Sequence, residues 1–143
     1  MGLLSGMASL FHLHIDTAKK ELIREEVNLS EAVEAHISWK LRLQTYLEGK
    51  SKESLDPMVI CRDDQCKLGQ WIHGPALNHF HEFEPFHQLR ADHAQFHYLA
   101  ANVVQKVHAK EHAAAEAILK GDYQRISHKV VIALTELNNL VTQ

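Results

Sequence analysis

Apolar residues recur at helical spacing along most of the chain, and this pattern predicts three long amphipathic helices. The first begins near Asn28 and ends near Gly49, the second begins at Pro85, and the third follows Gly121. Residues three and four positions apart share one face of a helix, so each apolar stripe is expected to face a common core. The inward residues are Leu29, Val33, His36, Leu43 and Leu47 in the first helix; Phe86, Leu89, His93, Phe96, Ala100, Val103 and Val107 in the second; and Ile126, Val130, Leu134, Leu137 and Val141 in the third.

Local signals mark the ends of these helices. Asn28, followed three residues later by a glutamate, is a capping-box variant typical of a helix start. Pro85 suits the first turn of a helix, because a backbone N–H group there would have no acceptor within the helix. The second helix either continues to Lys120 or breaks within residues 108–112, and the pattern leaves both open. Gly121-Asp122 is expected to give a turn and an N-cap, after which the last helix begins.

The segment 50–84 is interrupted by glycines and prolines, which favour short helices over a long one. Short helical turns are expected around Lys67–His73 and Pro75–Phe83. Gly69 is expected to let the backbone bend sharply, and Trp71 to anchor this loop in the core.

These elements together predict an all-α chain. Three long helices and shorter pieces are expected to form an antiparallel four-helix bundle over residues 28–143, with short extra helices in the 50–84 connection. Residues 1–27 are expected to be a short helix around Lys19–Val27 or a linker.

Size and composition narrow the class of protein. The chain has 143 residues, enough for one domain, and its 45% hydrophobic and 23% charged residues are typical of a folded protein. A net charge of -3 without a basic block argues against nucleic acid as a partner. No apolar run approaches the ~20 residues that span a bilayer, and the start lacks the charged region of a signal peptide. Two cysteines only five positions apart fit a reducing, cytoplasmic setting better than a disulfide scaffold.

Histidine is the unusual feature of the composition, with 12 residues in the chain. His93 and His97 are four positions apart, about 6 Å along a helix, and face the same side. His36 is predicted to face the core from another helix. Together with the thiol of Cys66 they would fill a tetrahedron, which is typical of a structural or regulatory zinc and leaves no open position for catalysis.

Other interpretations of these residues remain open on the spacing alone. A histidine on an apolar helix face is usually a hydrogen-bonded core residue, and a His-x-x-x-His pair arises often by chance in a histidine-rich chain. His108 and His112 have the same spacing, but Lys110 and Glu111 between them indicate a solvated turn.

Three segments resemble one known family in their order, their separation and their flanking tryptophans and glycine. They are Ala35-His36-Ile37-Ser38-Trp39-Lys40, Cys66-Lys67-Leu68-Gly69-Gln70-Trp71-Ile72 and His93-Ala94-Gln95-Phe96-His97. This pattern strongly resembles the bacterial chemoreceptor zinc-binding domain over about residues 28–141. The resemblance implies a four-helix bundle that binds one zinc per chain. Its ligands would fall on His36, Cys66, His93 and His97.

The resemblance also implies a sensory role rather than an enzymatic one. Such domains are typically attached to chemotaxis receptors or diguanylate cyclases, where they report zinc or oxidants, and a homodimer is expected by analogy. We therefore expect zinc occupancy, or oxidation of the Cys66 thiolate, to be coupled to chemotaxis or cyclic-di-GMP control. Cys61 has no counterpart among the family's ligands and is expected to be an ordinary thiol. No output module accompanies the domain here, so it would be free-standing or part of a longer protein.

Three competing functions are kept for comparison. A hemerythrin-like di-iron bundle would be all-α and histidine-rich, and His112 with Glu116 even offers a His-x-x-x-Glu pair. However, the carboxylates of Asp92 and Glu82 are poorly placed to bridge two irons. A metal-free helical interaction module would use the histidines only for packing. A zinc hydrolase would need an open coordination position and a general base, and neither is evident.

Overall fold

Helices and short connections make up residues 14–143, the part of the chain that the computed structural model describes. No strand occurs within this range, so the prediction of an all-α chain is confirmed. The helices are α2 (Thr17–Glu26), α3 (Leu29–Leu47), α4 (Pro57–Ile60), α5 (Lys67–Ile72), α6 (Pro75–Phe80), α7 (Glu84–His108), α8 (His112–Lys120) and α9 (Asp122–Thr142).

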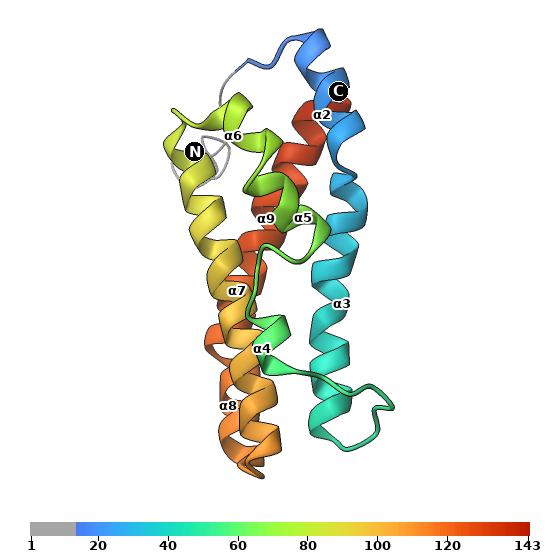
Figure 1. Ribbon diagram of the computed structural model, residues 1–143, viewed down its shortest axis with the longest axis vertical. Helices are drawn as coiled ribbons and strands as arrows, with labels where there is room; N and C mark the ends of the chain where they lie inside the picture. The colour runs from blue at the N-terminus through green and yellow to red at the C-terminus, as the bar shows by residue number, and fades with distance from the viewer. Residues whose placement is uncertain (1–13) are drawn as a thin grey trace, which may run out of the picture.

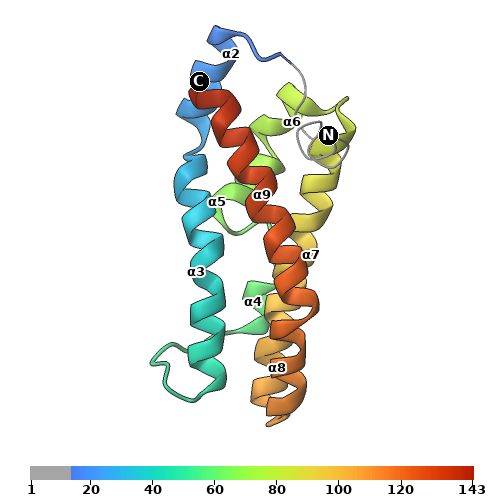
Figure 2. The same ribbon diagram turned by 180° about the vertical axis from the view of Figure 1, so that it is seen from behind.

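The chain runs up and down along one long axis (Figures 1 and 2). Helix α3 runs in one direction, α4 to α6 return, α7 runs in the first direction again, and α8 and α9 return together (Figure 1). The short helices cover the front of the pair α3 and α7, whereas α9 covers its back (Figure 2). The arrangement differs from four continuous helices because the connection between α3 and α7 is divided into three short helices: residues 61–66 separate α4 from α5, and Gly74-Pro75 separates α5 from α6.

The predicted ends of the first long helix agree with the structure. The side chain of Asn28 accepts a hydrogen bond from the backbone N–H of Glu31 at 3.0 Å, which caps α3. At the other end Gly49 has a φ of 74°, a left-handed conformation that suits glycine.

A left-handed residue also decides where the second long helix ends. Lys110 has a φ of 62°, and its N–H donates to the carbonyl of Val107 at 2.9 Å. The next N–H, of Glu111, donates to the carbonyl of Lys106 at 2.8 Å. These bonds close α7 and turn the chain back into α8, so the helix breaks within residues 108–112 rather than continuing to Lys120.

The predicted apolar stripes form the core. Most of their members are buried, and the remaining four, Val33, Leu47, Val107 and Ile126, are partly buried against the core. The core also includes aromatic residues from the short helices, such as Phe80 of α6.

The N-terminal helix α2 belongs to the same core. It packs against α9, and its Ile23 is fully buried. The carboxylate of Glu26 accepts hydrogen bonds from Trp71 Nε1 at 2.9 Å and from His79 Nε2 at 3.0 Å. Of the two expectations for residues 1–27, a helix is therefore found at Thr17–Glu26, while residues 1–13, including the expected absence of a signal peptide, lie outside the described range. None of the helices within residues 14–143 has the length and apolar character needed to cross a membrane.

Candidate metal centre

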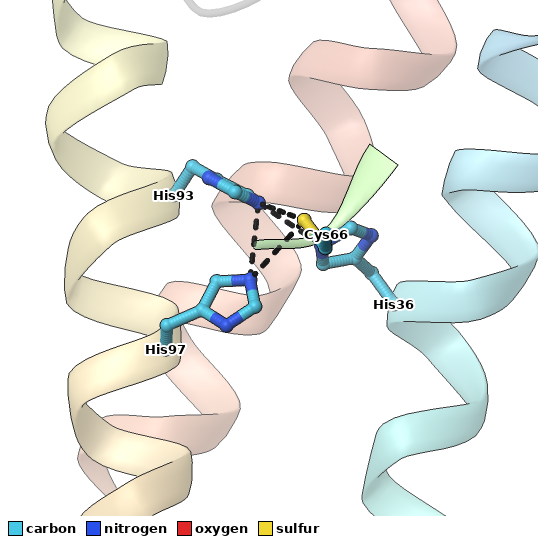
Figure 3. A group of neighbouring side chains, drawn as sticks. All are labelled: His36, Cys66, His93 and His97. Atoms are coloured by element: carbon cyan, nitrogen blue, oxygen red, sulfur yellow. Dashed lines mark hydrogen bonds between the residues drawn. The ribbon is translucent and has the colours of Figure 1, made fainter. Parts of the chain in front are cut away.

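Three histidines and one cysteine converge in the core between α3, α5 and α7. His36 projects from α3, and His93 and His97 project from successive turns of α7, with at most 5% of each residue exposed to solvent. Cys66 lies at the start of α5 and reaches the same point (Figure 3). One ligand atom from each residue lies within 4.8 Å of all the others, so this cluster could hold one metal ion.

Four of the six distances between these atoms are close to the edges of a zinc tetrahedron. Zinc bonds of about 2.0–2.1 Å to nitrogen and about 2.3 Å to sulfur separate tetrahedral ligand atoms by about 3.3 Å for N···N and about 3.6 Å for N···S. His93 Nε2 lies 3.2 Å from the Nε2 atoms of both His36 and His97. Cys66 Sγ lies 3.4 Å from His93 Nε2 and 3.6 Å from His97 Nε2. His93 is therefore at tetrahedral separations from its three neighbours, and the whole group lies within 4.8 Å, close enough to hold a single ion.

Backbone carbonyls orient two of the histidines for metal binding. Nδ1 of His36 is 2.7 Å from the carbonyl oxygen of Ala32, and Nδ1 of His97 is 2.9 Å from that of Ile60. A carbonyl oxygen only accepts, so both Nδ1 atoms carry the proton and both Nε2 lone pairs point into the cluster. Lone pairs directed at one point repel each other unless a cation lies between them, and this donor set fits zinc.

Burial sets the protonation of the cluster. It is the main cause that lowers the pKa of His36 and His97, and it lowers the pKa of His93 to about 2, helped by the neighbouring imidazoles. All three rings are therefore neutral at pH 7. Burial raises the pKa of the Cys66 thiol, so in the protein alone the sulfur is protonated, and a bound cation would favour the thiolate.

The loop that carries Cys66 depends on Gly69 for a different reason than the sequence suggested. Gly69 lies inside α5, and its backbone N–H donates to Cys66 Sγ at 3.3 Å. A Cβ atom at this position would lie 1.6 Å from the carbonyl oxygen of Asp63. The glycine is thus needed for close packing of α5 on the preceding loop rather than for a sharp bend. Trp71, which is 2% exposed, anchors the helix as expected.

The other residues considered from the sequence lie away from this cluster. His108 is exposed and contacts Tyr46 Oη at 2.6 Å, and His112 is exposed as well. The side chain of Glu82 is 88% exposed, and Asp92 accepts a hydrogen bond from Gln88 at 2.9 Å. Within residues 14–143 no carboxylate joins the metal-type group, and the di-iron alternative therefore lacks its bridging ligands.

The second cysteine is also separate from the cluster. Cys61 is exposed, is not disulfide-bonded, and its thiol donates to the carbonyl of Met58 at 3.4 Å. This agrees with the expectation of an ordinary thiol.

Two cavities open on either side of Cys66. The larger, about 730 Å³, lies between α2, α3 and α5 and is lined in part by His36, Cys66 and Trp71. The smaller, about 450 Å³, is lined in part by Trp39, Cys66 and His97. Cys66 is half-buried and lines both cavities, whereas each histidine of the cluster is at most 5% exposed.

The sequence interpretation missed Asp63, whose carboxylate faces the cluster from the loop before α5. Asp63 Oδ2 lies 3.6 Å from His93 Nδ1 and accepts a hydrogen bond from His73 Nε2 at 2.8 Å. An Asp-Asp pair shortly before the cysteine is visible in the sequence, but only the loop geometry distinguishes Asp63 from Asp64.

Comparison with known proteins agrees with the geometry. Residues 36–104 match the family model of the chemoreceptor zinc-binding domain. The chain carries a chemoreceptor zinc-binding domain. The matched stretch begins at His36 and ends within α7, and it includes all four residues of the cluster. Neither the curated proteins nor the solved structures contain a match to this chain. Chemoreceptor zinc-binding domains bind zinc, and the predicted zinc cofactor is thereby confirmed.

Proposed function

We propose that this domain is a zinc sensor in which one ion is held by the four residues of the cluster. The proposed ligand atoms are the Nε2 atoms of His36, His93 and His97 and the Sγ of Cys66. The observation that carries the proposal is the convergence of these atoms within 4.8 Å in a largely buried site, with His93 Nε2 at separations typical of tetrahedral zinc from the other three ligand atoms.

A regulatory role is favoured over catalysis by the number of protein ligands. Three imidazoles and one thiolate complete a tetrahedron, so no position remains for a water or a substrate. Bound zinc would favour the thiolate form of Cys66, which stays nucleophilic at neutral pH. Oxidation of Cys66 would remove this ligand, and the cavities beside it give an oxidant access to the sulfur.

The position of Cys66 in the fold supports a coupling between the site and the rest of the domain. Cys66 is the N-cap of α5, and Trp71 on the same helix donates a hydrogen bond to Glu26 of α2. A change at the sulfur would therefore alter the position of α5 and, through Trp71, that of α2. We propose that a signalling partner reads this change.

The partner is proposed to belong to bacterial chemotaxis or cyclic-di-GMP control, as a chemoreceptor or a diguanylate cyclase. A homodimer is also proposed, and the exposed apolar side chains of Ile37 and Leu41 on α3 would suit such a contact. A cytoplasmic location is proposed because both cysteines are free.

Metal analysis of the purified protein tests the binding proposal. We expect about one zinc per chain in the wild type, and loss of zinc in Cys66→Ala and His93→Ala, because each variant removes one of four proposed ligands. His128→Ala, which changes an exposed histidine of α9, is the matched control and should keep its zinc. Circular dichroism would verify that all variants remain helical. Two irons per chain, or no metal in the wild type, would refute the proposal.

Hydrogen exchange tests the sensory part separately. Zinc removal by a chelator, or treatment with hypochlorous acid, should accelerate amide exchange in α4, α5 and the loop between them. Each of these helices is six residues or shorter and contacts the site directly, α4 through the Ile60 carbonyl that faces His97 and α5 through Cys66 at its start. Unchanged exchange throughout the domain would show that the site does not control helix packing.

A further inference from the structure

The three histidines of the cluster differ in what holds their outer nitrogen. Nδ1 of His36 and Nδ1 of His97 each face a backbone carbonyl at hydrogen-bonding distance. Nδ1 of His93 is buried and has no hydrogen-bond partner among residues 14–143. Metal-binding histidines almost always donate this second N–H to an acceptor, which fixes the ring and the tautomer. His93 therefore lacks a contact that its two neighbours have.

The carboxylate of Asp63 is placed to supply that contact. Its Oδ2 lies 3.6 Å from His93 Nδ1, about 0.7 Å beyond a normal N–H···O bond. The side chain is only 19% exposed, so water competes little for this oxygen. The Nδ1 atoms of His36 and His97, in contrast, already have backbone acceptors.

Neighbouring groups hold Asp63 in this position. His73 Nε2 lies 2.8 Å from the same Oδ2, and Arg90 Nη2 lies 3.4 Å from His73 Nδ1. Arginine can only donate, so His73 accepts at Nδ1 and donates from Nε2 to the carboxylate. On the backbone side, the carbonyl of Asp63 packs against Gly69, the residue whose N–H contacts the Cys66 sulfur. Asp63 is therefore fixed both at its side chain and at its main chain.

We propose that Asp63 is the positioning residue of His93, accepting a hydrogen bond from Nδ1–H and so keeping the Nε2 lone pair directed at the zinc. His73 holds the carboxylate in place from the surface side. This inference rests on the proposed function, because it concerns how tightly the same site binds its ion. A carboxylate in this role makes the imidazole a stronger ligand, and its loss typically weakens metal affinity by about 10–100-fold.

The adjacent aspartates provide the experiment with a matched control. Asp64 is exposed and pairs with Arg62 rather than with the cluster. Zinc affinity would be measured by chelator competition for the wild type, Asp63→Ala, Asp63→Asn, Asp64→Ala and Asp64→Asn. We expect Asp63→Ala to weaken affinity about 10–100-fold and Asp63→Asn to weaken it less, because the amide oxygen still accepts but carries no charge. Both Asp64 variants should remain within about threefold of the wild type, as expected for a surface charge.

A second readout separates positioning from a general effect on the loop. Nitrogen-15 spectra of the zinc-loaded protein should give a protected Nδ1–H signal for all three histidines in the wild type. In Asp63→Ala the His93 signal should lose its protection while those of His36 and His97 remain. The melting temperatures of the metal-free Asp63→Asn and wild-type proteins should agree, because that variant keeps the size of the side chain.

The outcomes distinguish this inference from the function on which it rests. Wild-type zinc affinity in both Asp63 variants would overturn it while leaving zinc binding intact. Equal losses in the Asp63 and Asp64 variants, or a weakened site with an unchanged His93 Nδ1–H signal, would also overturn it, since the loop rather than the hydrogen bond would then be responsible. A wild-type protein that binds no zinc would overturn the proposed function as well.

Discussion

The cluster shows how surroundings set the chemistry of single residues. Burial holds the pKa of His93 at about 2 and keeps that ring neutral, as a metal ligand must be. The same burial raises the pKa of Cys66, so its thiolate form depends on a nearby positive charge. In such a site the imidazole rings stay neutral, and the thiol would lose its proton when a cation binds.

Gly69 gives a prediction at this scale. In Gly69→Ala the new Cβ would overlap the backbone of Asp63, so the loop that carries Cys66 must shift. We expect zinc affinity to fall at least about tenfold, and the free energy of unfolding of the metal-free protein to fall by about 1–3 kcal/mol from overpacking. Chelator competition and urea denaturation would measure the two effects.

Gly49→Ala is the matched control for this substitution. Gly49 has a positive φ, so alanine there is strained and should cost about 1 kcal/mol of stability. No atom of the described residues lies within 4 Å of the Cβ that would be added, and the site is remote, so zinc affinity should not change. Equal zinc affinities for both variants would contradict the packing role of Gly69.

Among the elements, the short helix α5 joins the metal site to the N-terminal helix. Its first turn presents Cys66, and Trp71 in its last turn donates to Glu26 of α2. Glu26 also accepts from His79 of α6, whose side chain is 8% exposed. A single carboxylate thus connects three helices from separate parts of the chain, which makes α2 a structural member of the bundle.

The Glu26 contacts lead to a second prediction. Glu26→Ala leaves the buried donor groups of Trp71 and His79 without their acceptor, which typically costs about 1–3 kcal/mol. We expect the free energy of unfolding to fall by this amount in urea denaturation. The neighbouring exposed residue offers a control, because Glu25→Ala should change stability by less than about 0.5 kcal/mol. A similar loss in the two variants would mean that the carboxylate of Glu26 does not join the helices.

For the molecule as a whole, the metal-type cluster joins long continuous helices to the short helices of the connection. Helices α3, α7 and α9 are continuous and supply most of the buried core, whereas α4, α5 and α6 are each six residues or shorter. The long helices α3 and α7 carry the three histidines, whereas the cysteine lies at the start of the short helix α5. Loss of the sulfur ligand is therefore expected to loosen the short helices before the long ones.

The buried histidines also predict how the metal-free protein responds to pH. The pKa values of His36, His93 and His97 are lowered in the folded state, so below about pH 6.5 the unfolded chain binds protons that the folded chain does not. The free energy of unfolding should therefore fall as the pH falls from about 6.5 to about 5, by up to about 1.4 kcal/mol per pH unit for each histidine that stays neutral.

Urea denaturation of the metal-free protein at several pH values in this window would measure the slope. Carboxylates titrate mostly at lower pH and contribute little there. His93→Gln should reduce the slope of the free energy of unfolding against pH by the contribution of one histidine. His128→Gln, at an exposed position, should leave this slope unchanged. A stability that does not change over this window would contradict the burial of neutral histidines.

The sequence by itself determined the long helices and most of the site. Apolar spacing, the cap at Asn28 and the stop at Gly49 are local properties, so α3, α7 and α9 and their buried faces could be predicted from it. The four residues of the metal-type cluster could also be named, because the inward-facing histidines belong to these same stripes and the family pattern adds the cysteine.

Only the tertiary structure decided what depends on contacts between distant segments. The turn at Lys110, the membership of α2 in the core, the packing of Gly69 on Asp63 and the contact of Asp63 with His93 follow from how the helices and loops meet. Neither hydrophobic spacing nor residue type distinguishes Asp63 from Asp64, since both are polar loop residues. Their roles differ because one carboxylate faces a buried nitrogen without a partner, and the other faces solvent.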